Sequence, residues 1–234
     1  MKRLLSAALA LATTVALAAP ASAALRAPQI LFDPGPLQIR LDGFGEAIDV
    51  HADQQEGLVW GSTVSTNSTM TIQFQLSGNP HGNTMGISKL TATALGTVLN
   101  GTAQVFPASA GTGWFAVASF RPGNTLIVNL FDANAVLQGT TTYAGVNRSL
   151  YGYYISNGSG TFHSHDGLNA DGKAHALAFA GTGQNKGSWW LAFEDSPISD
   201  YATEDFDDAL IFMESINPTP VAQTSWGSLK ARFR

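Results

Sequence analysis

The stretch that decides the fold is Thr71–Leu76, which reads TIQFQL and alternates polar with apolar side chains at every position. Successive side chains of a strand point to opposite faces, so Ile72, Phe74 and Leu76 share one face. The turn-forming residues SGNP at 77–80 end the pattern. The sequence therefore predicts a β-strand with one buried face.

Similar strand patterns recur along the chain at a spacing of roughly ten residues and are separated by turn residues. They are predicted at 114–120, 125–131, 135–137 and 150–155, and the segment 132–134 has the composition of a hairpin turn. No segment between them has a convincing helical period. We therefore predict an all-β protein, a single antiparallel β-sandwich domain with a jelly-roll-like topology.

The composition agrees with this fold class. Only 12% of the residues are charged while 44% are hydrophobic, and the chain has 24 glycines and no cysteine. Such a chain can build a core and is not expected to be disordered. Because no disulfide can form, an exported domain of this kind must rely on its core, on a bound metal, or on both.

The N-terminus has the pattern of a secretory signal peptide, predicted over residues 1–23. Lys2 and Arg3 precede an apolar segment at 4–19, and Ala-Ser-Ala at 21–23 fits a cleavage site. Cleavage would remove two of the 12 basic residues. The remaining ten basic residues and the 17 acidic residues give a net charge of −7. We expect a secreted protein that binds no nucleic acid and has no membrane span.

The mature chain divides into a β-sandwich domain at 24–216 and a short tail at 217–234. Pro218 and Pro220 open the tail, which continues as a basic and aromatic stretch containing Trp226. Two roles remain open for this tail. It docks on the domain, or it acts as a sorting or attachment signal.

An acidic stretch follows the predicted strands. Between Glu194 and Glu214 it holds eight carboxylates and no lysine or arginine. Two carboxylates about 4 Å apart repel by roughly 4 kcal/mol at an effective dielectric near 20. A hard dication with oxygen ligands, Ca²⁺ above all, would neutralise them. The alternative is a solvated acidic hairpin.

Strand geometry selects candidate ligands within the acidic stretch. If the strand runs through 204–212, Asp205 and Asp207 share one face, whereas Asp208 lies with Phe206 on the face toward the core. Asp195 and Asp208 have an alternative role, which is to accept backbone N–H bonds in the loop. The predicted ligands of a calcium ion are Glu194, Asp195, Asp205, Asp207 and Asp208.

Three histidines suggest a second kind of metal site. His163 and His165 would lie on one face of a strand, with His175 further along the chain, an arrangement that zinc or iron sites use. The glutamate that a cupin-type site needs a few residues later is missing. We expect these histidines to be hydrogen-bonded or exposed instead.

An enzyme on the same scaffold is the rival hypothesis. Two acids across a sugar cleft could hydrolyse a glycoside, with Trp189, Trp190 and Tyr201 stacking on the sugar. The chain has none of the common nucleophile, zinc-protease or phosphate-loop motifs. We therefore assign no catalytic residue, and keep a carbohydrate-active or metal-dependent enzyme as the alternative.

The segment 151–213 resembles the bacterial family known as domain of unknown function 4114. The matching residues are Leu168-Asn169-Ala170-Asp171-Gly172, His175, Leu177-Ala178-Phe179, Phe193-Glu194-Asp195 and Asp205-Phe206-Asp207-Asp208. The resemblance implies an exported or surface-associated β-domain with a calcium site. Members of the family are similar to modules of adhesins, lectin-like proteins and matrix proteins.

The sequence and the resemblance together give one functional expectation. We expect a secreted calcium-binding module with a binding or structural role at the bacterial cell surface or in the extracellular matrix. Adhesion and carbohydrate binding are both compatible with this role. The expected partners are a carbohydrate or a protein of the surface or matrix.

Overall fold

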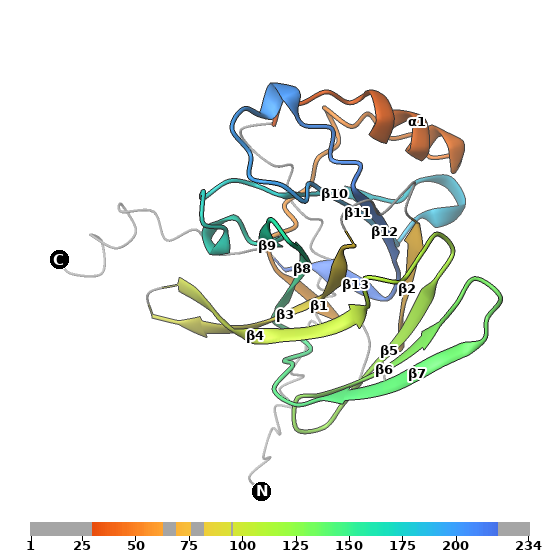
Figure 1. Ribbon diagram of the computed structural model, residues 1–234, viewed down its shortest axis with the longest axis vertical. Coiled ribbons are helices and arrows are strands. Elements are labelled where there is room, and N and C mark those ends of the chain that lie inside the picture. Colours follow the sequence, from red (N-terminus) through yellow and green to blue (C-terminus); the bar gives the residue numbers. More distant parts are fainter. Residues whose placement is uncertain (1–29, 63–68, 76–81, 95, 220–234) are drawn as a thin grey trace, which may run out of the picture.

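The computed structural model describes residues 30–62, 69–75, 82–94 and 96–219, with side chains described outside 69–75 (Figure 1). Within these ranges it has one α-helix, α1 (Gly35–Gly43), and strands β1 to β13 in two antiparallel sheets. The prediction of an all-β sandwich is confirmed. The predicted signal peptide and the tail beyond Thr219 lie outside the described residues.

The first sheet has six strands. Its order is β13 (Ile216–Pro218), β1 (Trp60–Ser62), β8 (Tyr151–Asn157), β3 (Thr84–Thr93) and β4 (Gly96–Phe106), and β9 (Gly160–His163) also pairs with β8. β8 thus lies at the centre of this sheet and is buried along most of its length.

The second sheet has seven strands. Its order is β10 (Ala176–Ala180), β11 (Trp189–Phe193), β12 (Ala209–Met213), β2 (Thr69–Gln75), β5 (Phe115–Arg121), β6 (Thr125–Phe131) and β7 (Leu137–Tyr143). Short 3-10 turns lie between strands at Asp166–Leu168, Gly183–Asn185 and Tyr201–Thr203. The last of these turns lies in the connection that carries the acidic stretch from β11 to β12.

The main hydrophobic core fills the space between the two sheets. From the six-stranded sheet it receives alternate residues such as Ile87 and Tyr153, and from the seven-stranded sheet Phe120, Leu191 and Ile211. The alternation of buried and partly exposed residues along β5 and the first part of β6 is what a strand with one core face gives. The alternation of apolar and polar residues in the sequence therefore reflects burial in this core.

A second core covers the outer face of β10, β11 and β12. Here Leu177, Trp190 and Leu210 pack against Leu37 and Leu41 of α1 and against the chain before and after that helix. Figure 1 places α1 beyond β10 to β12, on the side away from the six-stranded sheet. These three strands are buried on both faces, which is why their sequences are continuous apolar runs without alternation.

Several strand predictions agree with the structure, and others need correction. β6 has the predicted bounds, and β2, β5 and β8 differ from theirs by one or two residues, while Leu76 and the turn at 77–80 lie outside the described residues. The predicted strand at 135–137 begins late, at Leu137, because Ala135 has a positive φ of 60°. The helix α1 lies before the predicted strands, in a segment for which we made no prediction from the sequence.

The boundary predicted at 216 falls inside a strand. Asn217 and Pro218 belong to β13, which pairs with β1 at the edge of the six-stranded sheet. Proline is tolerated there because an edge strand leaves one row of N–H groups unpaired.

Candidate metal centre

The pairing of β11 with β12 brings two parts of the acidic stretch together. The last residue of β11, Phe193, lies opposite the first residue of β12, Ala209. Glu194 and Asp195 directly follow β11, and Asp208 directly precedes β12. The three carboxylates therefore meet at the same end of the strand pair, although Asp195 and Asp208 are 13 positions apart in the sequence.

Glu194, Asp195 and Asp208 form what we call the carboxylate cluster. Each offers one carboxylate oxygen, and these oxygens lie within 4.8 Å of one another. Glu194 is 6% exposed and Asp195 is 2% exposed, while Asp208 is partly buried. In the described part of the chain, this is the single group of three or more metal-ligating side chains.

Hydrogen bonds fix the carboxylate cluster in place. The Asp195 N–H donates to Asp208 Oδ2 at 2.8 Å, and the Ser196 hydroxyl donates to Glu194 Oε1 at 2.8 Å. The Asn83 amide donates to Asp195 Oδ2 at 2.6 Å, and the Asn157 amide donates to the Asp195 carbonyl at 3.0 Å. Asp208 therefore accepts a backbone N–H bond in the loop, which is the alternative role that the sequence left open for it.

The two asparagines connect the sheets. Asn83 lies just before β3 and Asn157 ends β8, both in the six-stranded sheet, whereas Asp195 follows β11 of the seven-stranded sheet. The carboxylate cluster therefore lies where the two layers of the sandwich are bridged by side chains.

Burial and mutual repulsion disfavour full ionisation of the carboxylate cluster. Burial, followed by the charge of Asp208, raises the pKa of Glu194 to about 8. Burial raises the pKa of Asp208 to about 6, and the nearby Asp195 adds to this effect although its N–H opposes it. At neutral pH, Glu194 therefore holds a proton unless a cation replaces it.

The other two predicted ligands lie outside the carboxylate cluster. Asp207 Oδ2 accepts from Arg40 Nη2 of α1 at 2.6 Å, in a partly buried ion pair. Asp205 Oδ1 accepts from the Asp207 N–H at 3.2 Å. The two residues therefore connect the loop to itself and to α1.

The alternation expected through 204–208 is wrong. β12 begins only at Ala209, and Phe206 has a positive φ of 52°, which turns the chain. Phe206 is fully buried in the second core. That burial stabilises a backbone conformation that is uncommon for a bulky residue.

The turn at Asn169–Gly172 lies beside the carboxylate cluster and is joined to it by His175. The His175 ring, fully buried and stacked on Phe162 at 4.2 Å, contacts Asp171 Oδ2 through Nε2 at 2.8 Å and the Glu194 carbonyl through Nδ1 at 3.2 Å. Burial alone would raise the pKa of Asp171, but the Lys173 N–H and the His175 ring hold it below its ordinary value. These contacts orient the loop behind Glu194.

Of the other two histidines, His163 has a side-chain partner, whereas His165 Nδ1 is buried and makes no hydrogen bond within the described part of the chain, contrary to our expectation. His163 is buried, and its Nδ1 lies 2.8 Å from the Ser88 hydroxyl. Burial, together with the nearby His165, lowers the pKa of His163 to about 4. His163 is thus a neutral, hydrogen-bonded core residue, as the sequence led us to expect.

Of the aromatic residues considered for sugar stacking, the two tryptophans are buried and Tyr201 is partly buried. Trp190 is 2% exposed, stacks on Phe44 at 4.9 Å and donates from Nε1 to Glu46 at 2.7 Å. Trp189 is buried against Trp60. The Tyr201 hydroxyl accepts from the Ala174 N–H at 2.6 Å, with Lys173 over its ring.

The sequence analysis missed Glu46. Its carboxylate is 6% exposed and accepts four hydrogen bonds, from the Thr182 N–H and hydroxyl, the Asn185 amide and the Trp190 indole, at 2.6 to 2.7 Å. These partners lie at least 136 residues away in the chain. No local pattern signals such a residue, because every partner is distant.

Comparisons with known proteins add little to this description. No protein-family model and no curated protein matches the chain. Among solved structures, sheep galectin-11 in complex with glycerol is 8% identical and aligns over 69% of this chain and 93% of its own, with a TM-score of 0.19. A TM-score this low carries no weight for fold or function.

The structure itself defines the class of protein. It is an antiparallel β-sandwich with a carboxylate cluster at one end of the β11–β12 pair. Of the helices in the described ranges, none has the length and apolar character that a membrane crossing requires.

Proposed function

We propose that the protein is a secreted calcium-binding β-sandwich module with a binding or structural role at the bacterial cell surface or in the extracellular matrix. Glu194, Asp195 and Asp208 are the proposed calcium ligands. The observation that carries the proposal is the convergence of three carboxylate oxygens within 4.8 Å at a buried position.

The donor set favours Ca²⁺ over other common metals. It consists of oxygens alone, without the sulfur or imidazole nitrogen that zinc sites prefer. Ca²⁺ takes about six to eight oxygen ligands in flexible geometry, so backbone carbonyls and water would complete the shell. Burial and, to a smaller extent, repulsion between the carboxylates raise the pKa of Glu194 and of Asp208, and a dication would offset both effects.

The position of the carboxylate cluster supports a structural role. Asp195 is hydrogen-bonded to Asn83 and Asn157 of the other sheet, so a metal held there would strengthen the link between the layers. A protein without cysteine has no disulfide for this purpose. The packed positions of Trp190 and Tyr201 favour this role over glycoside hydrolysis at the same place.

The test is a titration of the mature protein with Ca²⁺. Binding is measured by calorimetry and by the change in the melting temperature of the protein. A ligand that binds only the native state stabilises it by about 2.7 kcal/mol at a hundredfold excess over Kd. We expect millimolar Ca²⁺ to raise the melting temperature, EGTA to reverse the rise, and Mg²⁺ to have a smaller effect. An unchanged melting curve at millimolar Ca²⁺ would refute the proposal.

A matched pair of variants separates ligand from surface charge. Asp208→Asn removes a charge from the carboxylate cluster, whereas Asp200→Asn makes the same chemical change at an exposed loop residue that caps a 3-10 turn. We expect the first to weaken Ca²⁺ affinity at least tenfold and the second to leave it within about twofold, since exposed charges are screened over about 8 Å. Equal affinities would mean that the acidic stretch acts as a diffuse field.

A further inference from the structure

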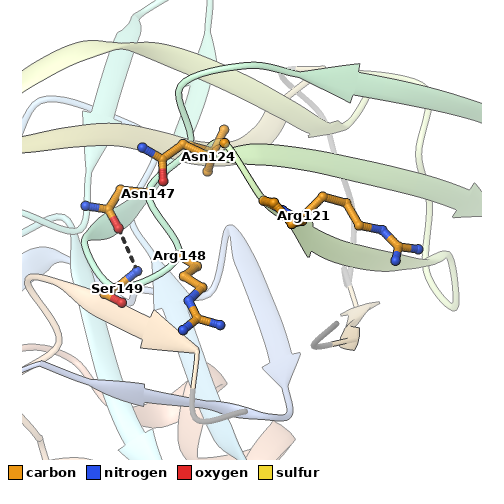
Figure 2. Close-up of a pocket in the computed structure, with 8 residues that line it drawn as sticks. Arg121, Asn124, Asn147, Arg148 and Ser149 are labelled. Atoms are coloured by element: carbon orange, nitrogen blue, oxygen red, sulfur yellow. Dashed lines mark hydrogen bonds between the residues drawn. The ribbon is translucent and has the colours of Figure 1, made fainter. Parts of the chain in front are cut away.

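A pocket remote in sequence from the carboxylate cluster lies between the β5–β6 turn and the connection from β7 to β8, which joins the two sheets (Figure 2). Arg121 ends β5 and Asn124 lies in the turn that follows, and Asn147, Arg148 and Ser149 come from the connection between β7 and β8. The pocket encloses about 220 Å³. We call it the arginine pocket.

Hydrogen bonds hold the walls of the arginine pocket. The Val146 N–H donates to the Asn124 carbonyl at 2.8 Å and joins the two segments, while the Ser149 N–H donates to Asn147 Oδ1 at 3.0 Å. The Arg148 carbonyl accepts from the Ser62 N–H of β1 at 2.8 Å. The pocket is therefore formed before any ligand arrives, which lowers the entropic cost of binding.

The arginine pocket gathers positive charge on an acidic protein. The described residues hold 17 acidic side chains and six basic ones, Arg40, Lys89, Arg121, Arg148, Lys173 and Lys186. Two of these six line this one pocket, and no acidic residue lines it. A concave site with one sign of charge concentrates ions of the opposite sign.

Arg148 is the residue that most needs a ligand. Its Nη1 is buried and has no hydrogen-bond partner among the residues that the structure describes. A buried guanidinium N–H that makes no hydrogen bond loses free energy relative to water. Figure 2 shows the Arg148 side chain on one side of the pocket, with Arg121 extending away from it on the other.

We propose that the arginine pocket binds the oxyanion of a small acidic ligand, a carboxylate or a sulfate, with Arg148 as the residue that binds it. The planar guanidinium fits such groups in a two-pronged arrangement, which a lysine cannot provide. The volume is below the roughly 300–1,000 Å³ of pockets for drug-sized ligands, so it suits one small unit such as a single acidic sugar residue. The proposal does not depend on the calcium site.

The test uses the mature protein, ¹⁵N-labelled, at constant ionic strength and with EGTA present. The probes are sodium glucuronate and sodium sulfate, and glucose is the uncharged comparator with the same ring. We expect saturable shifts of the Val146, Arg148 and Ser149 amide signals with at least one anion and none with glucose. Binding of both anions would identify a general oxyanion site. Binding of one anion alone would show whether the pocket selects a carboxylate or a sulfate. Shifts confined to other regions, or no saturation with either anion, would overturn the proposal.

Variants give an independent measurement. Arg148→Gln should weaken the affinity for the bound anion about tenfold, since hydrogen bonds to charged groups are strong, and Arg148→Lys should restore only part of it. Lys186→Gln is the matched control, because it removes the same charge from an exposed loop position outside the arginine pocket. Equal weakening by Arg148→Gln and Lys186→Gln would reduce the effect to net charge and contradict the proposal. The direct shifts in the unmodified protein remain decisive if Arg148→Gln fails to fold.

Discussion

Single residues far from the carboxylate cluster also stabilise the fold, and Glu46 is a clear case. Its buried carboxylate accepts four hydrogen bonds from Thr182, Asn185 and Trp190. These bonds hold the chain after α1 against the loop between β10 and β11. The same contacts lower the pKa of Glu46 against the opposing effect of burial, so the ionised form is favoured in the native state.

Glu46→Gln should therefore destabilise the protein although it changes only one group. A glutamine amide NH₂ would face donors that now meet a carboxylate oxygen, which leaves buried donors unsatisfied. We expect a loss of about 3 kcal/mol in the free energy of unfolding, measured by urea denaturation. Glu214→Gln, at an exposed residue, is the control and should change stability by less than about 0.5 kcal/mol. A change of that small size for Glu46→Gln would show that its hydrogen bonds are dispensable.

The candidate site could be predicted from the sequence only in part. The sequence predicted three residues of the site, Glu194, Asp195 and Asp208, because they directly flank apolar segments that pair as neighbouring strands. The location of Asp207 depends on Arg40, which lies 167 residues away, and on the positive φ of Phe206. The alternation of side chains along a strand predicts neither the distant ion pair of Asp207 nor the positive φ of Phe206.

At the scale of elements, the period of two predicts strands with one core face and fails for strands with two. The strands β5 and β6 were predicted from their alternation. The strands β10 to β12 are uniform apolar runs, so their sequences gave no indication of the second core. α1 was missed because its sequence, GPLQIRLDG, holds two glycines and a proline. Tertiary packing of Leu37 and Leu41 outweighs that weak propensity.

The helix offers a test of the second core. Leu41 is fully buried in α1, whereas Ile39 of the same helix is 71% exposed. Leu41→Ala should cost about 3 kcal/mol of stability through lost burial and a residual cavity. Ile39→Ala should be nearly neutral, because it removes a similar volume from the solvent side. Similar urea midpoints for the two variants would mean that α1 contributes little to the domain.

At the scale of the whole molecule, buried titratable groups make stability depend on pH. The pKa of His163 is about 4 in the folded protein, lowered mainly by burial from its ordinary value of 6.5. Its contribution is therefore fully present above pH 6.5 and is lost as the pH falls toward 4. Glu194 acts in the opposite sense, because its raised pKa adds stability as the pH falls from 8 toward 4.5.

A comparison of variants isolates the histidine. Between pH 7 and pH 5, protonation linked to His163 should remove about 2 kcal/mol at most from the free energy of unfolding. His163→Asn should abolish that component of the slope, measured by urea denaturation across the range. Parallel slopes in the unmodified protein and in His163→Asn would contradict a buried neutral His163.

The link between the two sheets gives the last prediction. If Ca²⁺ occupies the carboxylate cluster, its effect should reach the six-stranded sheet through Asn83 and Asn157, which hold Asp195. Thr84 and Ser156, the neighbours of these asparagines, face each other across β3 and β8. We expect Ca²⁺ to slow hydrogen exchange in the segments 83–86 and 154–157 as well as around the carboxylate cluster.

Short labelling times are needed for that measurement, because they report local opening and not global unfolding. The strands β6 and β7, at the other edge of the seven-stranded sheet, are the internal control and should exchange at the same rate with and without Ca²⁺. Protection limited to residues 194–208 would mean that the metal orders only its own loop. Protection that also includes β3 and β8 would mean that a metal performs, in this cysteine-free sandwich, the cross-linking that disulfides perform in many exported domains.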